Sequence, residues 1–169
     1  DGLVDSFDGV SMGTLTDGPN SDLGISREQQ DEVAAASHQR AAKAQEDGIF
    51  AQEIAPIEIP QRKGDPVVVD TDQGIRPEAT VETLAKLRPV FLKANGTITA
   101  GNSSPISDGA AAVVLASRAY AEKHGLDYLA VVGKAGQTAG PDNSLHAQPA
   151  DSLKEALRRA EWDAQELDF

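Results

Sequence analysis

The spacing of apolar and polar residues predicts one long helix in the first third of the chain and several shorter ones after it. Residues 26–46 include an alanine-rich run of high helix propensity, and Ser26 and Gln29 have the spacing of a capping box. Gly48 follows as a natural end. Shorter helices are predicted at residues 80–87, with Thr80 as N-cap, at residues 117–124, with Ser117 as N-cap, and at residues 151–160.

Apolar runs that are too short for helices predict strands. Residues 54–59, which are interrupted by proline, fit an edge strand, and residues 67–69 fit a second short strand. Residues 110–116 and 129–132 are continuously apolar, which is typical of strands buried on both faces of a sheet. Helices and strands in this order predict an α/β fold. Its sheet is expected to be incomplete within this chain, with exposed edges that favour association.

A loop of small residues lies at the centre of the pattern. Pro89 ends the helix before it, Asn95-Gly96 predicts a turn, and residues 97–99 suit a short extended segment. Between residues 100 and 109 almost every side chain is small, so a ligand could approach the main chain closely. Composition leaves a second interpretation open, namely a plain surface loop of turn-forming residues.

Composition and charge narrow the classes of partner. The chain has 169 residues, of which 40% are hydrophobic, and its mean hydropathy is -0.35, so we expect no membrane span. Its formal net charge of -12 argues against nucleic acid or anionic lipid as the main partner. An anionic small molecule needs only a local basic patch. Arg62 and Lys63 form the densest local positive charge of the chain. The pair could contact a phosphate, or it could simply belong to a solvated turn.

The chemistry available to the chain is limited by its residue types. It has no cysteine, which excludes a disulfide, a thiolate metal site and a thiol nucleophile within the chain. The acidic loop at residues 70–73 lacks the glycine and final glutamate of a calcium-binding loop, so no metal site is predicted. His38, within a predicted helix, is interpreted as an ordinary exposed or half-exposed histidine, and His124, in the last turn of another, is interpreted as structural. The first residues do not resemble a signal peptide, and we expect a cytoplasmic location.

Several sequence motifs resemble those of the thiolases. The runs KLRPVF, at residues 86–91, and NGTITAGNSSPISDGAAAVVLAS, at residues 95–117, are similar to the central signature of that family. The segments DGLVDSFDGVSMG, ISREQQDEVAAASHQRAAKAQEDGIF, EIAPIEIPQRKGD and IRPEATVETLAKLRP follow the family's order and approximate spacing. The resemblance weakens from Val131 onward.

The resemblance implies a layered α/β fold and an enzyme that makes or cleaves 3-ketoacyl-CoA thioesters through an acylated cysteine. It further implies that residues 1–104 form most of the loop domain that covers coenzyme A. Residues 105–127 would then end the N-terminal core domain, and residues 128–169 would begin the C-terminal one. The family's catalytic cysteines and histidine lie outside the matching motifs. No catalytic residue is therefore assigned, and the 169-residue chain alone is expected to be inactive.

The family's contacts with coenzyme A carry over onto residues in matching motifs. Arg76 falls where the family's arginine lies against the adenine and phosphate end of coenzyme A, and Ser104 falls on a pantetheine contact. The other positions implied to contact the nucleotide, the pantetheine arm or the acyl group are Thr83, Phe91, Ala100, Leu3, Met12 and Leu145. Coenzyme A would be bound as substrate, with no further cofactor, by a homodimer or homotetramer.

Two departures from the family pattern leave an alternative open. Ser11 stands where short-chain members commonly have histidine, which leaves the acyl-chain specificity open. Gly18-Pro19-Asn20 predicts an interruption of the helix that the family has after Met12. The alternative is a non-catalytic, thiolase-like protein that binds acyl-CoA or lipid.

Overall fold

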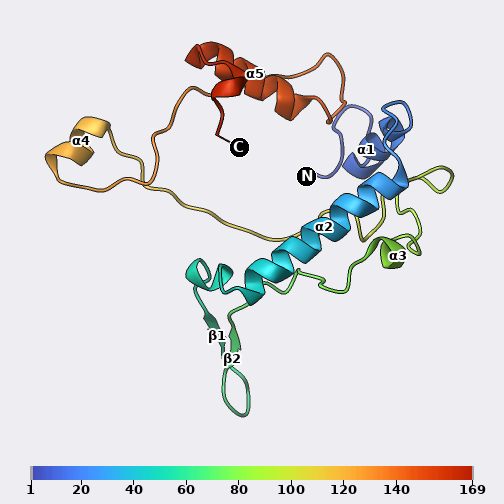
Figure 1. Ribbon diagram of the computed structural model, residues 1–169, viewed down its shortest axis with the longest axis horizontal. Coiled ribbons are helices and arrows are strands. Elements are labelled where there is room, and N and C mark those ends of the chain that lie inside the picture. The colour runs from blue at the N-terminus through green and yellow to red at the C-terminus, as the bar shows by residue number, and fades with distance from the viewer. Residues whose placement is uncertain (1, 169) are drawn as a thin grey trace. The chain divides into compact units, whose positions relative to one another are not determined.

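The computed structural model describes residues 2–168, which divide into two compact units (Figure 1). Residues 11–105 form one of them, called here the hairpin unit. Residues 1–10 and 106–169 form the other, called the terminal unit. The hairpin unit contains the β-strands and the longest helix of the described chain.

The longest helix of the hairpin unit, α2 (Arg27–Glu46), confirms the capping box predicted at its start. The Ser26 hydroxyl accepts a hydrogen bond from the Gln29 N–H at 3.2 Å, and the Gln29 side chain accepts one from the Ser26 N–H at 2.9 Å. The free N–H groups of this first turn favour a negative charge. The pKa of Glu28 is accordingly lowered, first by its own backbone N–H and then by Ser26.

Helix α1 (Met12–Asn20) shows that the prediction of a helix interrupted at Gly18-Pro19-Asn20 is wrong. Its N-cap is Ser11, whose side chain accepts a hydrogen bond from the Thr14 N–H. The helix continues through Pro19, and Asp17 and Asn20 at its end are buried. Their side chains bind the segment around Thr97, and these tertiary hydrogen bonds offset the single backbone hydrogen bond that a proline removes.

Helix α3 (Val81–Leu84) begins at the predicted N-cap but ends earlier than predicted. Thr80 and Thr83 cap one another reciprocally, which confirms the start. Arg27 binds the carbonyl oxygens of Leu84 and Leu87, so these groups are satisfied without a further turn of helix. The core of the hairpin unit lies between α2 and α3 and consists of Ala35, Ala79 and Leu84, with Ala34 and Val81 packed against it.

Strands β1 (Ile57–Ile59) and β2 (Val67–Val69) confirm the two predicted short strands, and the structure pairs them as an antiparallel hairpin. Ile57 pairs with Val69 and Ile59 with Val67. The 3-10 helix η1 (Phe50–Gln52) connects α2 to this hairpin. The strands pair only with each other among the described residues, and their apolar side chains are largely exposed.

The terminal unit contains α4 (Arg118–Lys123), α5 (Gln148–Ala160) and the 3-10 helix η2 (Ala164–Glu166). Ser117 caps α4 as predicted, whereas α5 begins earlier than predicted, with Pro149 in its first turn. The irregular segment at residues 135–140 lies along α5: the Arg159 guanidinium donates to the Ala135 carbonyl at 3.1 Å.

The prediction of buried strands at residues 110–116 and 129–132 is wrong for this chain. Both segments lack secondary structure, and their apolar side chains are exposed, with Val114 97% and Leu129 107% accessible. A strand requires a neighbour that pairs with its N–H and C=O groups. Among residues 2–168 neither segment has such a neighbour, so apolar character alone produces no strand. The domain boundaries at residues 104 and 127 stay predictions.

Candidate functional site

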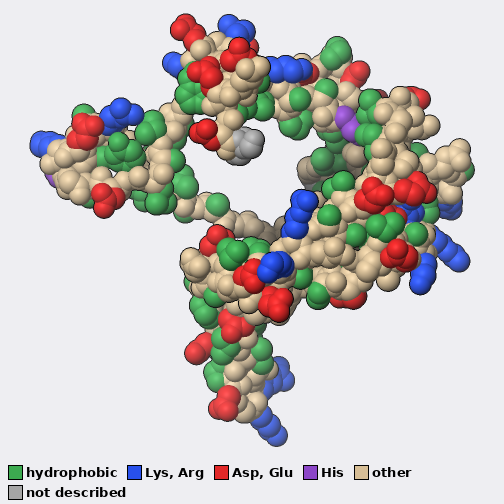
Figure 2. Space-filling view, in the orientation of Figure 1, with side chains coloured by type: hydrophobic (Ala, Val, Ile, Leu, Met, Phe, Trp, Pro, Cys, Tyr) green, Lys and Arg blue, Asp and Glu red, His purple; other side chains and the backbone are tan. Residues whose placement is uncertain are grey.

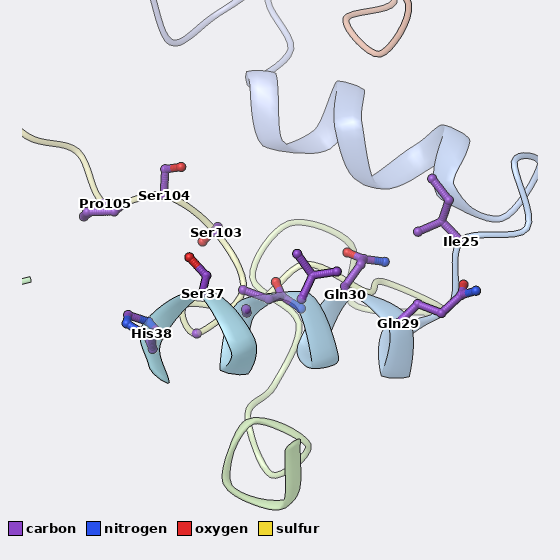
Figure 3. Close-up of a pocket in the computed structure, with 12 residues that line it drawn as sticks. Ile25, Gln29, Gln30, Ser37, His38, Ser103, Ser104 and Pro105 are labelled. Atoms are coloured by element: carbon purple, nitrogen blue, oxygen red, sulfur yellow. The ribbon is translucent and has the colours of Figure 1, made fainter. Parts of the chain in front are cut away.

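A groove of about 650 Å³ lies within the hairpin unit, between one face of α2 and the loop at residues 101–105 (Figure 3). The contributing helix residues are spaced three or four apart and therefore share one face. The lining mixes small apolar residues with side-chain amides and hydroxyls. The polar lining residues include Gln30, Ser37 and His38 from the helix and Asn102, Ser103 and Ser104 from the loop.

The loop side of the groove is held in shape by its own polar groups. The Thr99 N–H donates to Oδ1 of Asn102 at 2.7 Å, and the Ser103 hydroxyl donates to the Thr99 carbonyl at 2.7 Å. Thr99 itself is 0% exposed. Side chain to backbone hydrogen bonds of this kind replace the ladder that a strand or helix would provide. The loop is therefore a defined turn and not a loose surface connection.

Ser104 and Ala100 are the two predicted loop residues, and both are exposed. Ser104 lines the groove directly after the hydrogen-bonded turn (Figure 3). Among residues 2–168 no partner binds its hydroxyl, so the group can donate to or accept from a ligand. Ala100 is not part of the groove lining.

His38 and Arg76 meet beside the groove. The Arg76 backbone N–H donates to Nδ1 of His38 at 3.2 Å. This bond requires an unprotonated Nδ1, so in the neutral ring Nε2 carries the hydrogen and can donate. The Arg76 guanidinium donates to the carbonyl oxygens of Gln73, at 2.8 Å, and Ile75, at 3.1 Å. Arg76 is exposed, and the structure places it next to a residue of the groove.

Other predicted residues of the hairpin unit lie away from the groove lining. The Thr83 hydroxyl serves as a helix cap, accepting from the Thr80 N–H at 2.9 Å. The Phe91 ring lies against Gly13, where a Cβ would collide with it. Phe91 thus stands next to the start of α1, where the partly exposed Met12 is also found.

Leu3 and Leu145 belong to the terminal unit. Leu3 is half exposed and Leu145 is partly buried. A hydrogen bond of 2.6 Å from Nδ2 of Asn143 to Oδ2 of Asp8 connects the two ends of this unit near both residues. This hydrogen bond joins the segment that contains Leu3 to the segment that contains Leu145. Neither leucine lines the groove.

Arg62 and Lys63 lie between β1 and β2 and are exposed. Figure 2 shows Lys and Arg side chains gathered at the tip of the hairpin. Arg62 and Lys63 have no ion pair among those recorded for the described residues. The pair is a candidate contact for an anionic group, independent of the groove.

Two groove residues, His38 and Asn102, were not identified as functional candidates from the sequence, and neither was the buried Asp31 that binds Asn102. His38 was interpreted as an ordinary half-exposed histidine, and it is partly buried as expected, yet it lines the groove. The sequence signal that could have identified this side of the groove is helical spacing, which places Gln30, Ala34, Ser37 and His38 on one face. Nothing in the sequence links Asp31 to Asn102.

Residues 2–168 contain no group of three or more His, Asp or Glu side chains arranged to hold a metal ion. In the same part of the chain, no helix has the length and apolar character needed to cross a bilayer.

Comparison with known protein families matches residues 1–119 to the N-terminal domain of thiolase. A probable acetyl-CoA acetyltransferase of Mycolicibacterium smegmatis is 51% identical over 168 residues, which are 99% of this chain and 43% of that protein. The corresponding protein of Mycobacterium tuberculosis is 49% identical over 168 residues. The chain therefore spans less than half the length of these relatives.

Solved structures show the same similarity. The crystal structure of the Bacillus anthracis acetyl-CoA acetyltransferase has a TM-score of 0.88 and 37% sequence identity, over 99% of this chain and 42% of that one. The acetyl-CoA acetyltransferase of Syntrophomonas wolfei has a TM-score of 0.86 and 32% identity. These similarities confirm the predicted thiolase-like α/β fold, of which this chain covers only part.

Proposed function

This chain belongs to the thiolase family, and we propose that it supplies a coenzyme A binding surface to an enzyme that transfers acyl groups between coenzyme A thioesters. The observation that carries the proposal is the turn at residues 99–104. It is fixed internally, built of small residues, and presents the exposed Ser104 hydroxyl at a groove. A pantetheine arm is narrow and carries amide groups, so it fits such a surface and can hydrogen-bond to that hydroxyl.

Arg76 supports the same assignment through its geometry. Its guanidinium is held by the carbonyl oxygens of its own loop, while the side chain remains exposed. A held guanidinium loses less conformational entropy on binding than a free one does. Its planar face can stack on a base and its remaining N–H groups can meet a phosphate, a combination that lysine lacks.

The chemical step itself is assigned to a part of the enzyme other than this chain. An acyl group is carried by a thiolate, and the chain has no cysteine. The role of these residues is to bind and orient the thioester. We therefore expect the purified 169-residue chain to show no turnover of acetoacetyl-CoA.

The non-catalytic alternative rested on the departures at Ser11 and Pro19. In the structure Ser11 caps α1 and the helix continues through Pro19, so both departures are compatible with an ordered helix at this position. The predicted interruption at Pro19 therefore no longer supports the alternative, whereas the departure at Ser11 still does. We further propose that the exposed apolar segments, such as residues 110–116, support association in the complete protein.

The proposal is tested by titrating coenzyme A into the full-length protein that carries this chain, at one salt concentration. Arg76→Ala should weaken binding about fivefold to tenfold, since a partly solvated charge-assisted contact is worth about 1 kcal/mol. Ser104→Ala should weaken it by a similar factor or less, because it removes one hydrogen bond.

Arg62→Ala is the matched control, because it removes an exposed arginine of the same unit from a place remote in sequence from the groove. It should have a smaller effect. Unchanged affinity in Arg76→Ala together with weaker binding in Arg62→Ala would show that the hairpin tip is the phosphate contact and that the carry-over onto Arg76 is wrong.

A further inference from the structure

A buried acid under the groove connects the loop to α2. Asp31 is 1% exposed, and one of its oxygens, Oδ2, accepts from the Arg27 Nε at 2.7 Å, one turn earlier on the same helix. Its other oxygen, Oδ1, accepts from Nδ2 of Asn102 at 2.9 Å. A carboxylate this deeply buried is retained only where its charge is paired and its oxygens are hydrogen-bonded. Both oxygens of Asp31 meet that condition.

Asn102 uses both ends of its side-chain amide. Its Nδ2 donates to Asp31 and also to the Thr97 carbonyl, at 3.0 Å, while its Oδ1 accepts from the Thr99 N–H at 2.7 Å. The partners fix the orientation of the amide, because a carboxylate and a carbonyl need a donor and an N–H needs an acceptor. No other residue type of this size supplies that set of groups.

Arg27 extends the connection to the end of α3. Its terminal nitrogen donates to the Leu84 carbonyl at 2.6 Å and to the Leu87 carbonyl at 3.2 Å. One charge pair, Arg27 with Asp31, therefore joins three elements of the hairpin unit: α2, the end of α3 and the groove loop. These elements are distant in sequence, so the pair fixes their relative placement within that unit.

We propose that Asp31 is a positioning residue that acts through Asn102 to set the location of Ser104, and so tunes coenzyme A affinity without itself lining the groove. The proposal rests on the function proposed above for Ser104. Residues 99–103 are held by the Asn102 amide and the Ser103 hydroxyl, and Ser104 is the next residue along the chain. A displacement of the turn therefore moves the Ser104 hydroxyl with it.

The first test is a double-mutant cycle in the full-length protein, with coenzyme A affinity measured at slightly alkaline pH. Asn102→Asp keeps the shape and the acceptor for Thr99 but places a carboxylate against that of Asp31. We expect it to weaken binding about tenfold, because two like charges at hydrogen-bond distance repel. In the Ser104→Ala background the same change should have little further effect, since interacting residues give non-additive changes.

The second test exchanges the two groups. Asp31→Asn combined with Asn102→Asp returns one donor and one carboxylate to the pair, and it should recover part of the affinity lost in Asn102→Asp. Gln39→Ala is the control, because it removes another side-chain amide hydrogen bond of α2, to the Ala79 carbonyl, away from the loop. It should leave coenzyme A affinity unchanged.

The outcomes separate the two proposals. If Arg76→Ala and Ser104→Ala weaken binding while Asn102→Asp acts additively with Ser104→Ala, the positioning role is overturned and the binding surface stands. The same holds if Asn102→Asp binds normally, or if the exchange recovers nothing. If neither Ser104→Ala nor Arg76→Ala weakens binding, the proposed binding surface fails and the positioning role fails with it.

Discussion

The hairpin unit and the terminal unit are stabilised by different kinds of contact. In the hairpin unit, buried polar side chains bind backbone groups far away in sequence: Oδ1 of Asp17 accepts from the Thr97 N–H, 80 positions later, at 2.8 Å. In the terminal unit, the ion pairs on α5 join residues three or four apart, and they are exposed. Long-range buried contacts fix a tertiary arrangement, whereas local exposed pairs support only the helix that carries them.

This difference explains where the candidate site is found. A binding loop needs a support that holds it to a fraction of an ångström, and in the hairpin unit that support is the network of Asp31 and Asn102. The terminal unit instead exposes the apolar residues 110–116 and 129–132. Segments of this kind have little to resist local opening.

The largest effect is expected for Asp17, because it is 2% exposed and binds the backbone N–H groups of Thr97, Ile98 and Leu92. Asp17→Ala leaves these buried donors without a partner and should lower the free energy of unfolding of the hairpin unit by about 2 to 4 kcal/mol. Asp17→Asn keeps one oxygen and should cost less. Urea denaturation, followed by hydrogen exchange at residues 90–98, measures both.

Asp22→Ala is the control for Asp17, because Asp22 is exposed just after the same helix. It should change the free energy of unfolding by no more than about 0.5 kcal/mol. Equal effects of Asp17→Ala and Asp22→Ala would contradict the claim that buried long-range contacts stabilise the hairpin unit.

A smaller effect is expected in the terminal unit at Gly136, a point where the irregular segment approaches α5 closely. A Cβ on this residue would collide with the Ser152 carbonyl oxygen. Gly136→Ala should therefore displace the segment from the helix, at a cost of about 1 to 3 kcal/mol. Fluorescence of Trp162, the chain's single tryptophan, and hydrogen exchange in α5 report on this unit.

Gly133→Ala is the matched control, since a Cβ there meets no atom within 4 Å. It should leave both signals unchanged, and residues 90–98 of the hairpin unit should exchange normally in either variant. If Gly136→Ala behaves like Gly133→Ala, the packing of residues 135–140 on α5 is not a stabilising contact.

The smallest effect concerns the pH dependence of α5. Hydrogen bonds from Arg158 and then Arg159 lower the pKa of Glu155 from 4.5 to about 2. Because the folded pKa lies below the unfolded one, this carboxylate stabilises the helix above pH 4.5, and the contribution is lost as the pH falls towards 2. Glu155→Gln should remove that part of the pH dependence of helix content, measured by circular dichroism.

Salt provides the control for Glu155, because exposed ion pairs are screened at high ionic strength. The difference between the parent and Glu155→Gln should shrink as salt is added, while the effect of Asp17→Ala should persist. An acid dependence that is unchanged in Glu155→Gln would show that the exposed pairs contribute nothing to α5.

The sequence by itself determined the features that depend on neighbouring residues. Ser26, Thr80 and Ser117 cap their helices as predicted, because a cap needs only a side-chain oxygen and an N–H group three positions later. The short strands of the hairpin were predicted from their own apolar runs, and each has its partner close by in the chain. The family motifs, which are also continuous in sequence, were sufficient for the thiolase fold.

Only the tertiary structure decided the features that depend on distant partners. Helix α1 passes through Pro19 because Asp17 and Asn20 bind the segment around Thr97, and no local pattern encodes that gain. Residues 110–116 have the composition of a strand but no strand to pair with among the described residues. The link from Asp31 to Asn102 spans 71 positions. Its existence depends on how the backbone brings the two side chains within hydrogen-bond distance, which residue identity does not specify.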